Sequence, residues 1–246
     1  MIHKTTRSIL SVLLAALLLV TSIPLTPAFA GGGGAVSLQS ESGERGALEP
    51  VDGKYYISTA KQLKEFADKV NDDSGQYTDI DAELTDDIDL SEICSEEEGD
   101  SWTPIGNSEE NAYTGTFNGQ NFKISGLTIN DSTADDQGLF GYVGSSGKVQ
   151  NLSVSGNVSG SNSVGGVVGY NSGSVTNCYN IGDVSGSKYV GGVVGYNYSG
   201  GSVTNSYNTG EVSGGADVGG VVGMNSGNVE NCYNTGTVTG TDDYVG

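Results

Sequence analysis

Two carboxylates at matching positions of a repeated phrase are the residues of this 246-residue sequence that could do covalent chemistry. Asp183 and Glu211 lie one repeat apart, so a fold that stacks its repeats would place their Cα atoms about 5 Å apart. Paired carboxylates at such a spacing can cut glycosidic bonds. The matching positions of four successive repeats read Asn157, Asp183, Glu211 and Thr237, which offers no second acid pair. A solvated surface position is therefore the favoured interpretation, and polysaccharide cleavage is the weaker alternative.

A run of acidic residues upstream could bind a hard cation. Its members are Asp79, Asp81, Glu83, Asp86, Asp87 and Asp89. Calcium sites need several oxygens that converge on one point, and strand alternation could bring three of these carboxylates to one face. The spacing matches neither an EF-hand nor the Gly-Gly-x-Gly-x-Asp calcium repeat. The sequence favours a solvated acidic face without metal, with calcium binding in segment 79–100 left as the alternative.

The lack of imidazole excludes several kinds of catalyst. The single histidine is His3, which lies in a predicted leader peptide. The exported chain therefore has no His-based acid–base catalysis, no Ser-His-Asp or Cys-His nucleophile and no His-ligated zinc. The phrase Gly-Gly-Val-Val-Gly is followed by neither lysine nor a helix signal, so it fails as a phosphate loop. We predict a protein that is not an enzyme and that holds no cofactor.

Tyrosines at a fixed spacing are the candidates for ligand binding. Tyr179, Tyr207 and Tyr233 occupy matching positions of three repeats. Stacked outward rings can hold sugars or partner proteins through apolar area and a hydroxyl group. The alternative is that the rings only stabilise the sheet by stacking on one another. A second column of tyrosines is interrupted by a methionine: Tyr142, Tyr170, Tyr196 and Met224.

These residues are positioned by a repeat. The phrase Val-Gly-Gly-Val-Val-Gly-Tyr-Asn at 164–171 returns at 190–197 and, with Met in place of Tyr, at 218–225; it restarts at Tyr244-Val245. Steps of 26, 28 and 27 residues indicate one supersecondary unit stacked on copies of itself. Gly, Val, Ser, Thr and Asn dominate the unit, and they disfavour helix. Each unit contains three short apolar stretches, which predict an all-β fold: a parallel β-solenoid with three short strands per coil of about 27 residues.

Stacking predicts columns of like residues. Two valine columns should line the interior: Val149, Val175, Val203 and Val229, then Val158, Val184, Val212 and Val238. A third interior column mixes types: Leu152, Cys178, Ser206 and Cys232. Asparagine tolerates the left-handed backbone of a bend and can hydrogen-bond between coils, which suits Asn151, Asn177, Asn205 and Asn231. A second asparagine column comprises Asn180, Asn208 and Asn234.

The three cysteines are predicted to form no disulfide. Cys178 and Cys232 lie two coils apart, so their Cα atoms would be about 9.6 Å from each other, beyond disulfide reach. Cys94 lies far upstream of both.

The start of the chain is predicted to be a leader followed by a linker. Residues 1–30 combine a basic start, a short apolar run and an Ala-Phe-Ala site, which is typical of a secretory signal peptide. The apolar run is too short to span a membrane comfortably. Residues 31–50 are rich in glycine and serine with scattered glutamate, and they indicate a flexible linker.

Three further segments complete the predicted organisation. Residues 51–76 form an N-terminal cap whose helix runs from about 60 to 70, with Thr59 and Gln62 as a capping box. Residues 77–136 are irregular first coils. Residues 137–246 are the repeat coils, of which the last is incomplete.

The negative charge of the chain argues against anionic partners. The formal net charge is -20, and 24 of the 30 acidic residues lie within 31–136. This balance repels nucleic acid and anionic membrane surfaces, so we expect no nucleic-acid binding and no membrane insertion after the leader is removed.

The phrases at 138–141, 164–170 and 174–180 resemble the GLUG repeat, and 113–127 resembles the stretch that leads into such repeats. The GLUG family occurs in large bacterial surface and secreted proteins, including adhesin-like proteins and the non-catalytic parts of IgA-specific metallopeptidases. The resemblance implies a secreted or cell-surface location and an exported structural or binding module, adhesin-like or stalk-like. A host or matrix protein or a glycan is the expected partner. The alternative is the non-catalytic N-terminal part of a longer secreted enzyme.

Overall fold

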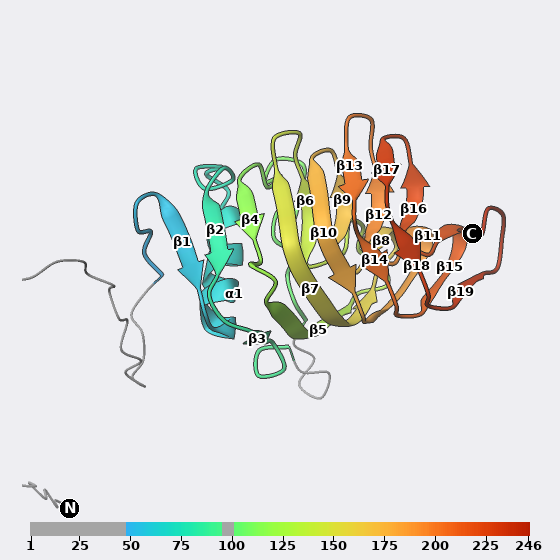
Figure 1. Cartoon of the computed structure of the whole chain (residues 1–246), viewed down its shortest axis with the longest axis horizontal. Coiled ribbons are helices and arrows are strands. Elements are labelled where there is room, and N and C mark those ends of the chain that lie inside the picture. The colour runs from blue at the N-terminus through green and yellow to red at the C-terminus, as the bar shows by residue number, and fades with distance from the viewer. Residues whose placement is uncertain (1–47, 95–100) are drawn as a thin grey trace, which may run out of the picture. The chain divides into compact units, whose positions relative to one another are not determined.

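The computed structural model describes residues 48–94 and 101–246, which form a parallel β-solenoid of about six coils (Figure 1). Strands from successive coils pair in parallel, with each residue beside its counterpart one repeat away; Val175, for example, lies between Val149 and Val203. The predicted fold class is confirmed. The predicted leader, residues 1–30, and most of the predicted linker lie outside the described residues.

The strands form a sheet of fifteen and a sheet of four. The main path of the large sheet comprises β1 Lys54–Ile57, β2 Asp81–Leu84, β4 Thr116–Asn118, β7 Lys148–Ser159, β10 Ser174–Asn180, β13 Ser202–Thr204 and β17 Asn228–Glu230. The other strands of this sheet are β3 Ile88–Asp89, β5 Lys123–Asn130, β8 Asn162–Gly165, β11 Asp183–Gly191, β14 Tyr207–Asn208, β15 Val212–Gly219, β18 Tyr233–Asn234 and β19 Val238–Gly240. The small sheet comprises β6 Phe140–Val143, β9 Val168–Asn171, β12 Val194–Asn197 and β16 Val222–Asn225.

Two columns of left-handed residues bend the coils. The predicted asparagine column is confirmed, with φ of 55°, 53°, 51° and 54° at Asn151, Asn177, Asn205 and Asn231. Its side chains bond between coils, as where Asn177 Nδ2 donates to Asn151 Oδ1 at 3.0 Å. A second column, which the sequence did not reveal, has φ between 54° and 63° at Asp136, Ser163, Tyr189, Asp217 and Tyr244. Its members share a left-handed backbone conformation, but no single residue type recurs at every coil.

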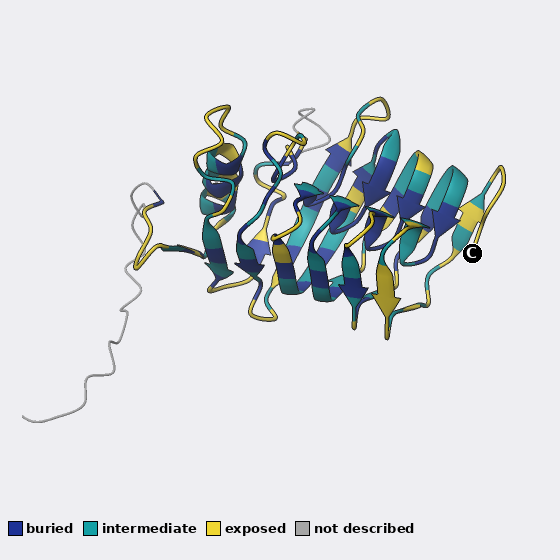
Figure 2. Ribbon diagram, turned by 90° about the horizontal axis from the view of Figure 1, so that it is seen from above, coloured by how far each residue is buried: buried dark blue, intermediate teal, exposed yellow. Residues whose placement is uncertain are grey.

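Small apolar side chains fill the interior of the repeat coils. Figure 2 shows buried residues along the strands of these coils. Seven of the eight valines predicted to line it are buried or partly buried. The prediction was wrong for Val229, whose exposed fraction is 38%, because no described strand covers this valine of β17. Leu152, Cys178 and Ser206 are fully buried in one column, and Cys232 is half-buried. The three cysteines form no disulfide among the described residues, and burial raises the pKa of Cys178 to about 12.

Asparagine ladders run through this interior as well. In the predicted second column, Asn180 Nδ2 donates to Asn208 Oδ1, and Asn208 Nδ2 donates to Asn234 Oδ1, both at 2.8 Å. A third ladder joins Asn171, Asn197 and Asn225 at the same distance. Each amide also donates to a backbone carbonyl near the following bend, as Asn208 does to Gly210. These bonds let buried amides repeat from coil to coil without loss of hydrogen-bond partners.

The helix α1, Ala60–Val70, follows β1 in the chain and packs beside β1 and β2 with one face exposed (Figure 1). Thr59 caps the helix by accepting from the Gln62 N–H at 3.2 Å, and Gln62 Oε1 reaches back to the N–H of Ser58. At the other end, the Asn71 side chain accepts from the N–H of Gly106 at 2.9 Å, which ties the helix to the next coil. The apolar face of α1 is buried at Leu63, Phe66, Ala67 and Val70.

Aromatic rings form the core around this helix. Phe66 contacts Tyr55, Tyr113 and Phe117, with ring centroids 5.9 to 6.0 Å apart. Phe140 completes the group at 5.4 Å from Tyr113 and 5.2 Å from Phe117. Burial raises the pKa of Tyr113 well above its ordinary value, and its hydroxyl donates to the Ile80 carbonyl at 2.9 Å. The interior of the first coils thus combines large aromatic rings with isoleucine and leucine side chains, whereas valines predominate in the interior of the later coils.

Candidate functional site

The three tyrosines predicted to bind a ligand form a continuous stack on the outer surface, which we call the tyrosine ladder: Tyr179, Tyr207 and Tyr233. The ring centroids of Tyr179 and Tyr207 are 4.2 Å apart, and those of Tyr207 and Tyr233 are 4.9 Å apart. The interplanar angles are 25° and 13°. Tyr233 is 55% exposed, and the other two rings are half-buried.

Strand alternation explains why the ladder faces outward. In β10, Cys178 before the tyrosine and Asn180 after it both point into the interior, so Tyr179 must point out. The same alternation holds for Ser206 and Asn208 on either side of Tyr207. Partial burial raises the pKa of Tyr179, and the neighbouring phenol of Tyr207 raises it further. The phenol of Tyr179 is therefore neutral near pH 7 and can act as a hydrogen-bond donor or acceptor.

A second aromatic group centres on the small sheet, with Tyr189 added from β11 of the large sheet and Tyr198 from the residue after β12. We call it the tyrosine cluster: Tyr142, Tyr170, Tyr189, Tyr196 and Tyr198. Tyr142 and Tyr170 stack with centroids 4.2 Å apart and an interplanar angle of 17°. Tyr189 and Tyr198 lie 5.4 and 5.8 Å from Tyr196. Burial raises the pKa of Tyr142 and Tyr170, so these phenols are also neutral.

Sequence periodicity found only part of this cluster. Tyr142, Tyr170 and Tyr196 follow the repeat, whereas Tyr189 belongs to the unrecognised bend column and Tyr198 precedes a two-residue insertion. The signal available in the sequence was the 28-residue step that contains Tyr198, against 26 residues for the step before it.

Within the carboxylate pair, the side chain of Asp183 is hydrogen-bonded to the backbone of Glu211. Asp183 Oδ1 accepts from the backbone N–H of Glu211 at 2.9 Å, and both residues are exposed. The structure therefore brings the two residues onto adjacent coils, as predicted. One of the two carboxylates is engaged with the backbone.

The acidic residues of segment 79–89 do not converge on one point. Asp81 accepts from the N–H of Thr116, and Glu83 pairs with Lys54 at 3.1 Å. Asp87 accepts from the N–H of Lys123, 36 residues away, and Asp89 accepts from the N–H of Ser91. Within residues 48–94 and 101–246, no group of three or more His, Cys, Asp or Glu side chains is arranged to hold a metal ion.

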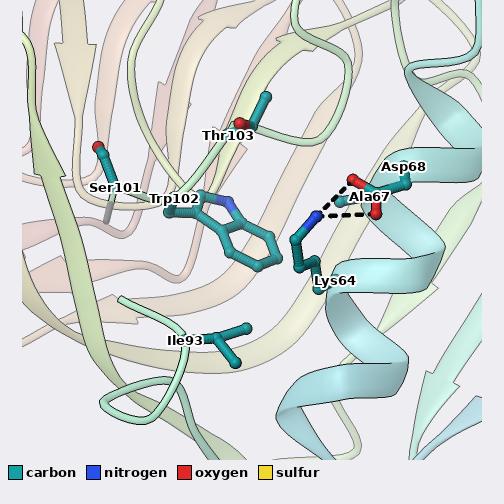
Figure 3. A pocket seen from close by; sticks show the side chains of 7 residues that line it. All are labelled: Lys64, Ala67, Asp68, Ile93, Ser101, Trp102 and Thr103. Carbon is teal, nitrogen blue, oxygen red and sulfur yellow. Dashed lines mark hydrogen bonds and ion pairs between the residues drawn. The ribbon is translucent and has the colours of Figure 1, made fainter. Parts of the chain in front are cut away.

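A small hollow lies between α1 and the segment that precedes Pro104 (Figure 3). Its lining residues are Lys64, Ala67, Asp68, Ile93, Ser101, Trp102 and Thr103. Lys64 Nζ bonds to both carboxylate oxygens of Asp68, at 2.9 and 2.8 Å, and the Trp102 indole donates to the Leu139 carbonyl. Its volume of about 30 Å³ fits a water molecule or two, far below the several hundred Å³ of small-molecule pockets.

Known proteins resemble the chain in sequence. The family model of the GLUG motif matches residues 160–185, 186–213 and 214–239. Halomucin from Haloquadratum walsbyi is 36% identical over 123 residues, which make up 48% of this chain and 1% of halomucin. A "Putative Gly-rich membrane protein" from Evansella cellulosilytica is 36% identical over 102 residues, which make up 42% of this chain and 11% of that protein.

A solved structure resembles it as well. It is the crystal structure of a "putative immunoglobulin A1 protease" from Bacteroides ovatus, with a TM-score of 0.61 and 28% identity. The match covers 78% of this chain and 61% of that chain. The present chain thus spans a small part of both sequence relatives and less than two thirds of the structural one. No helix among the described residues is long and apolar enough to cross a bilayer.

Fold and surface together define a β-solenoid protein made of stacked repeats, with tyrosines in register on its outer walls. The repeats of residues 160–239 are GLUG repeats, and the resemblance inferred from the sequence is confirmed.

Proposed function

We propose that the chain is an exported, non-enzymatic binding module, adhesin-like or stalk-like, and that the tyrosine ladder is its ligand face. The observation that carries the proposal is the register of the ladder, which presents three rings in a row with the last 55% exposed. Such a row offers apolar area together with hydroxyl groups, the combination that suits sugars and protein surfaces. A host or matrix protein or a glycan is the proposed partner.

Export to the medium or to the cell surface is part of the proposal. It is supported by the leader-like residues 1–30 and by the GLUG repeats. The lack of histidine beyond His3 and the engagement of Asp183 with the backbone favour a binding role over a catalytic one.

One alternative is favoured by a specific observation, the structural likeness to a protein described as an immunoglobulin A1 protease. In this alternative, the chain is the non-catalytic N-terminal part of a longer secreted enzyme. A His-Glu-x-x-His stretch encoded directly downstream of residue 246 would support this alternative, because two histidines at that spacing bind catalytic zinc.

The ladder can be tested with the full exported chain on an array of glycans and matrix proteins. Tyr207→Ala removes the central ring, and we expect it to weaken binding about tenfold, as loss of one aromatic contact would. Tyr56→Ala is the matched control, because Tyr56 is 42% exposed and lies on β1 at the other end of the solenoid. Equal binding by the wild type and Tyr207→Ala would contradict the assignment.

A further inference from the structure

We propose that the tyrosine cluster is a second, separate binding site and that it takes the pyranose rings of a neutral glycan chain. The starting point is Tyr198, which breaks the repeat. The N–H groups of Ser172, Tyr198 and Ser226 donate to equivalent carbonyls of the preceding coil, so the three residues occupy one column. The column needs only a small side chain, yet one coil carries a tyrosine.

An insertion accompanies this tyrosine. Ser199 and Gly200 follow Tyr198, whereas Ser172 and Ser226 are each followed directly by the next column residue, Gly173 and Gly227. Gly200 has a φ of 92°, which favours glycine, and the Gly201 N–H closes the turn on the Tyr198 carbonyl at 2.9 Å. Insertions in solenoids map to loops on one face, which is often the binding face. The turn fixes the backbone of Tyr198 while its side chain stays 44% exposed.

The added ring creates an angled group that the ladder lacks. Tyr198 lies 5.6 Å from Tyr170 at an interplanar angle of 29°, and 5.8 Å from Tyr196 at 84°. Tyr170 and Tyr196 meet at 5.2 Å and 79°. Tyr198 thus stacks on a ring of the preceding coil and meets a ring of its own coil edge-on. Stacking between coils accounts for the contact with Tyr170, whereas the edge-on contact with Tyr196 has no counterpart in the ladder.

The edge of the cluster carries a hydrogen-bond donor. Lys188 Nζ lies 4.4 Å from the centroid of the Tyr189 ring, and Tyr189 in turn contacts Tyr196. Asp217 on the next coil adds a weaker electrostatic attraction to the ammonium group, behind the larger effect of the Tyr189 hydroxyl. The site thus combines aromatic area, phenol hydroxyls and one ammonium with little net charge.

This chemistry fits a neutral glycan. The apolar faces of a pyranose ring stack on aromatic rings, and its hydroxyls hydrogen-bond to phenols and to an ammonium group. A polysaccharide also repeats its ring along one direction, as the tyrosine column of the small sheet repeats from coil to coil. The formal net charge of -20 disfavours a strongly anionic polymer. The inference does not depend on the tyrosine ladder, whose rings come from β10, β14 and β18 and share no residue with the cluster.

The test is affinity electrophoresis of the full exported chain in gels that contain hydroxyethylcellulose, laminarin or polygalacturonate. We expect retardation by at least one of the two neutral polymers and none by polygalacturonate. Tyr198→Ser, which copies the residue of the neighbouring coils, should weaken this binding at least tenfold. Tyr198→Phe keeps the ring and should stay within about threefold of the wild type. Tyr56→Ala again controls for loss of an exposed tyrosine elsewhere.

Three outcomes would overturn the inference: no retardation by either neutral polymer, equal retardation of the wild type and Tyr198→Ser, or stronger retardation by polygalacturonate. If Tyr207→Ala abolishes binding to a neutral polymer while Tyr198→Ser does not, the ladder is the glycan site. The proposed function then stands and the second site is refuted. Because serine already occupies this column in two coils, loss of folding is not expected to confuse the result, and the melting temperature of Tyr198→Ser checks this.

Discussion

The N-terminal coils and the repeat coils share one winding and fill it in different ways. Up to β6, a few large rings span the interior, and Phe66 of α1 contacts rings from three other segments. From β7 onward, valine columns and buried asparagine ladders add the same small layer at each coil. The irregular N-terminal coils therefore rely on contacts between residues of different elements, whereas the repeat coils rely on equivalent contacts between neighbouring repeats.

This contrast predicts that one substitution costs more stability in the N-terminal coils than in the repeat coils. Loss of one ring should remove contacts to several elements at once. Loss of one valine should affect only the layers directly above and below it, since each repeat contacts its neighbours alone.

The largest effect is expected for Phe117→Ala. The Phe117 ring is fully buried between Phe66 and Phe140, with centroids 5.9 and 5.2 Å away. Removing it should lower the free energy of unfolding by about 4 kcal/mol through lost burial and a cavity. Urea denaturation of the wild type and the variant measures this, and a loss below about 2 kcal/mol would remove the basis for the contrast.

Asn208→Ala should follow. Asn208 is fully buried, donates to Asn234 and Gly210, and accepts from Asn180. The substitution leaves buried partners without their bonds, so we expect a loss of about 2 to 3 kcal/mol in the free energy of unfolding. Asn231→Gly is the control, because it removes one exposed ladder bond and keeps the left-handed backbone. Similar losses in the two variants would show that burial of the ladder does not matter.

Two valines of one column test whether stability depends on a coil having a neighbour on both sides. Val203→Ala removes two methyl groups from a fully buried site and should cost about 2 kcal/mol. Val229→Ala acts on the same column where the side chain is 38% exposed, and it should cost less than about 0.5 kcal/mol. Thermal unfolding of both variants tests this, and equal shifts in Tm would contradict the structure of the last coil.

The smallest effect concerns pH at the junction of the two regions. Burial raises the pKa of Asp136 to about 6 from an ordinary 3.8, against the opposing hydrogen bond from Ser163. The folded chain therefore holds more protons than the unfolded chain between these values, and Asp136 makes stability fall as pH rises from about 4 to about 6.

Asp136→Asn removes this titration and keeps a residue that tolerates the φ of 55°. The stability of the variant, measured as the free energy of unfolding, should exceed that of the wild type by about 1 kcal/mol more at pH 7 than at pH 4. This figure allows for the partial exposure of the carboxyl group. Urea midpoints at the two pH values measure the difference. An unchanged difference between the two proteins would show that Asp136 does not titrate in this range.

The repeat made the C-terminal half predictable from sequence. A residue that recurs every 26 to 28 positions must stack on itself, so the valine columns, the asparagine bend and the tyrosine ladder followed from spacing alone. Val229 was misplaced because periodicity does not say which layer is the last to be covered. The second bend column escaped notice because only its backbone repeats, with Asp, Ser and Tyr among its members.

Two other features could not be read from periodicity. Tyr198 lies next to an insertion, and the matching residues of the neighbouring coils are serines, Ser172 and Ser226. The repeat therefore does not predict a tyrosine at this position. In the N-terminal coils, the contacts of Phe66 with Phe117, and of Phe117 with Phe140, join positions of different spacing and element type. Those contacts depend on how α1 packs onto the coils, which no repeated phrase specifies.

The shared register of successive coils would let the gene that encodes the protein gain or lose whole repeats. Each unit of 26 to 28 residues begins and ends at the same point of the winding and adds one layer of about 4.8 Å to the axis. Duplication or deletion of a whole unit would join like surfaces to like surfaces. The reach of the molecule is therefore adjustable by copy number, in small and evenly spaced steps, without redesign of any single layer.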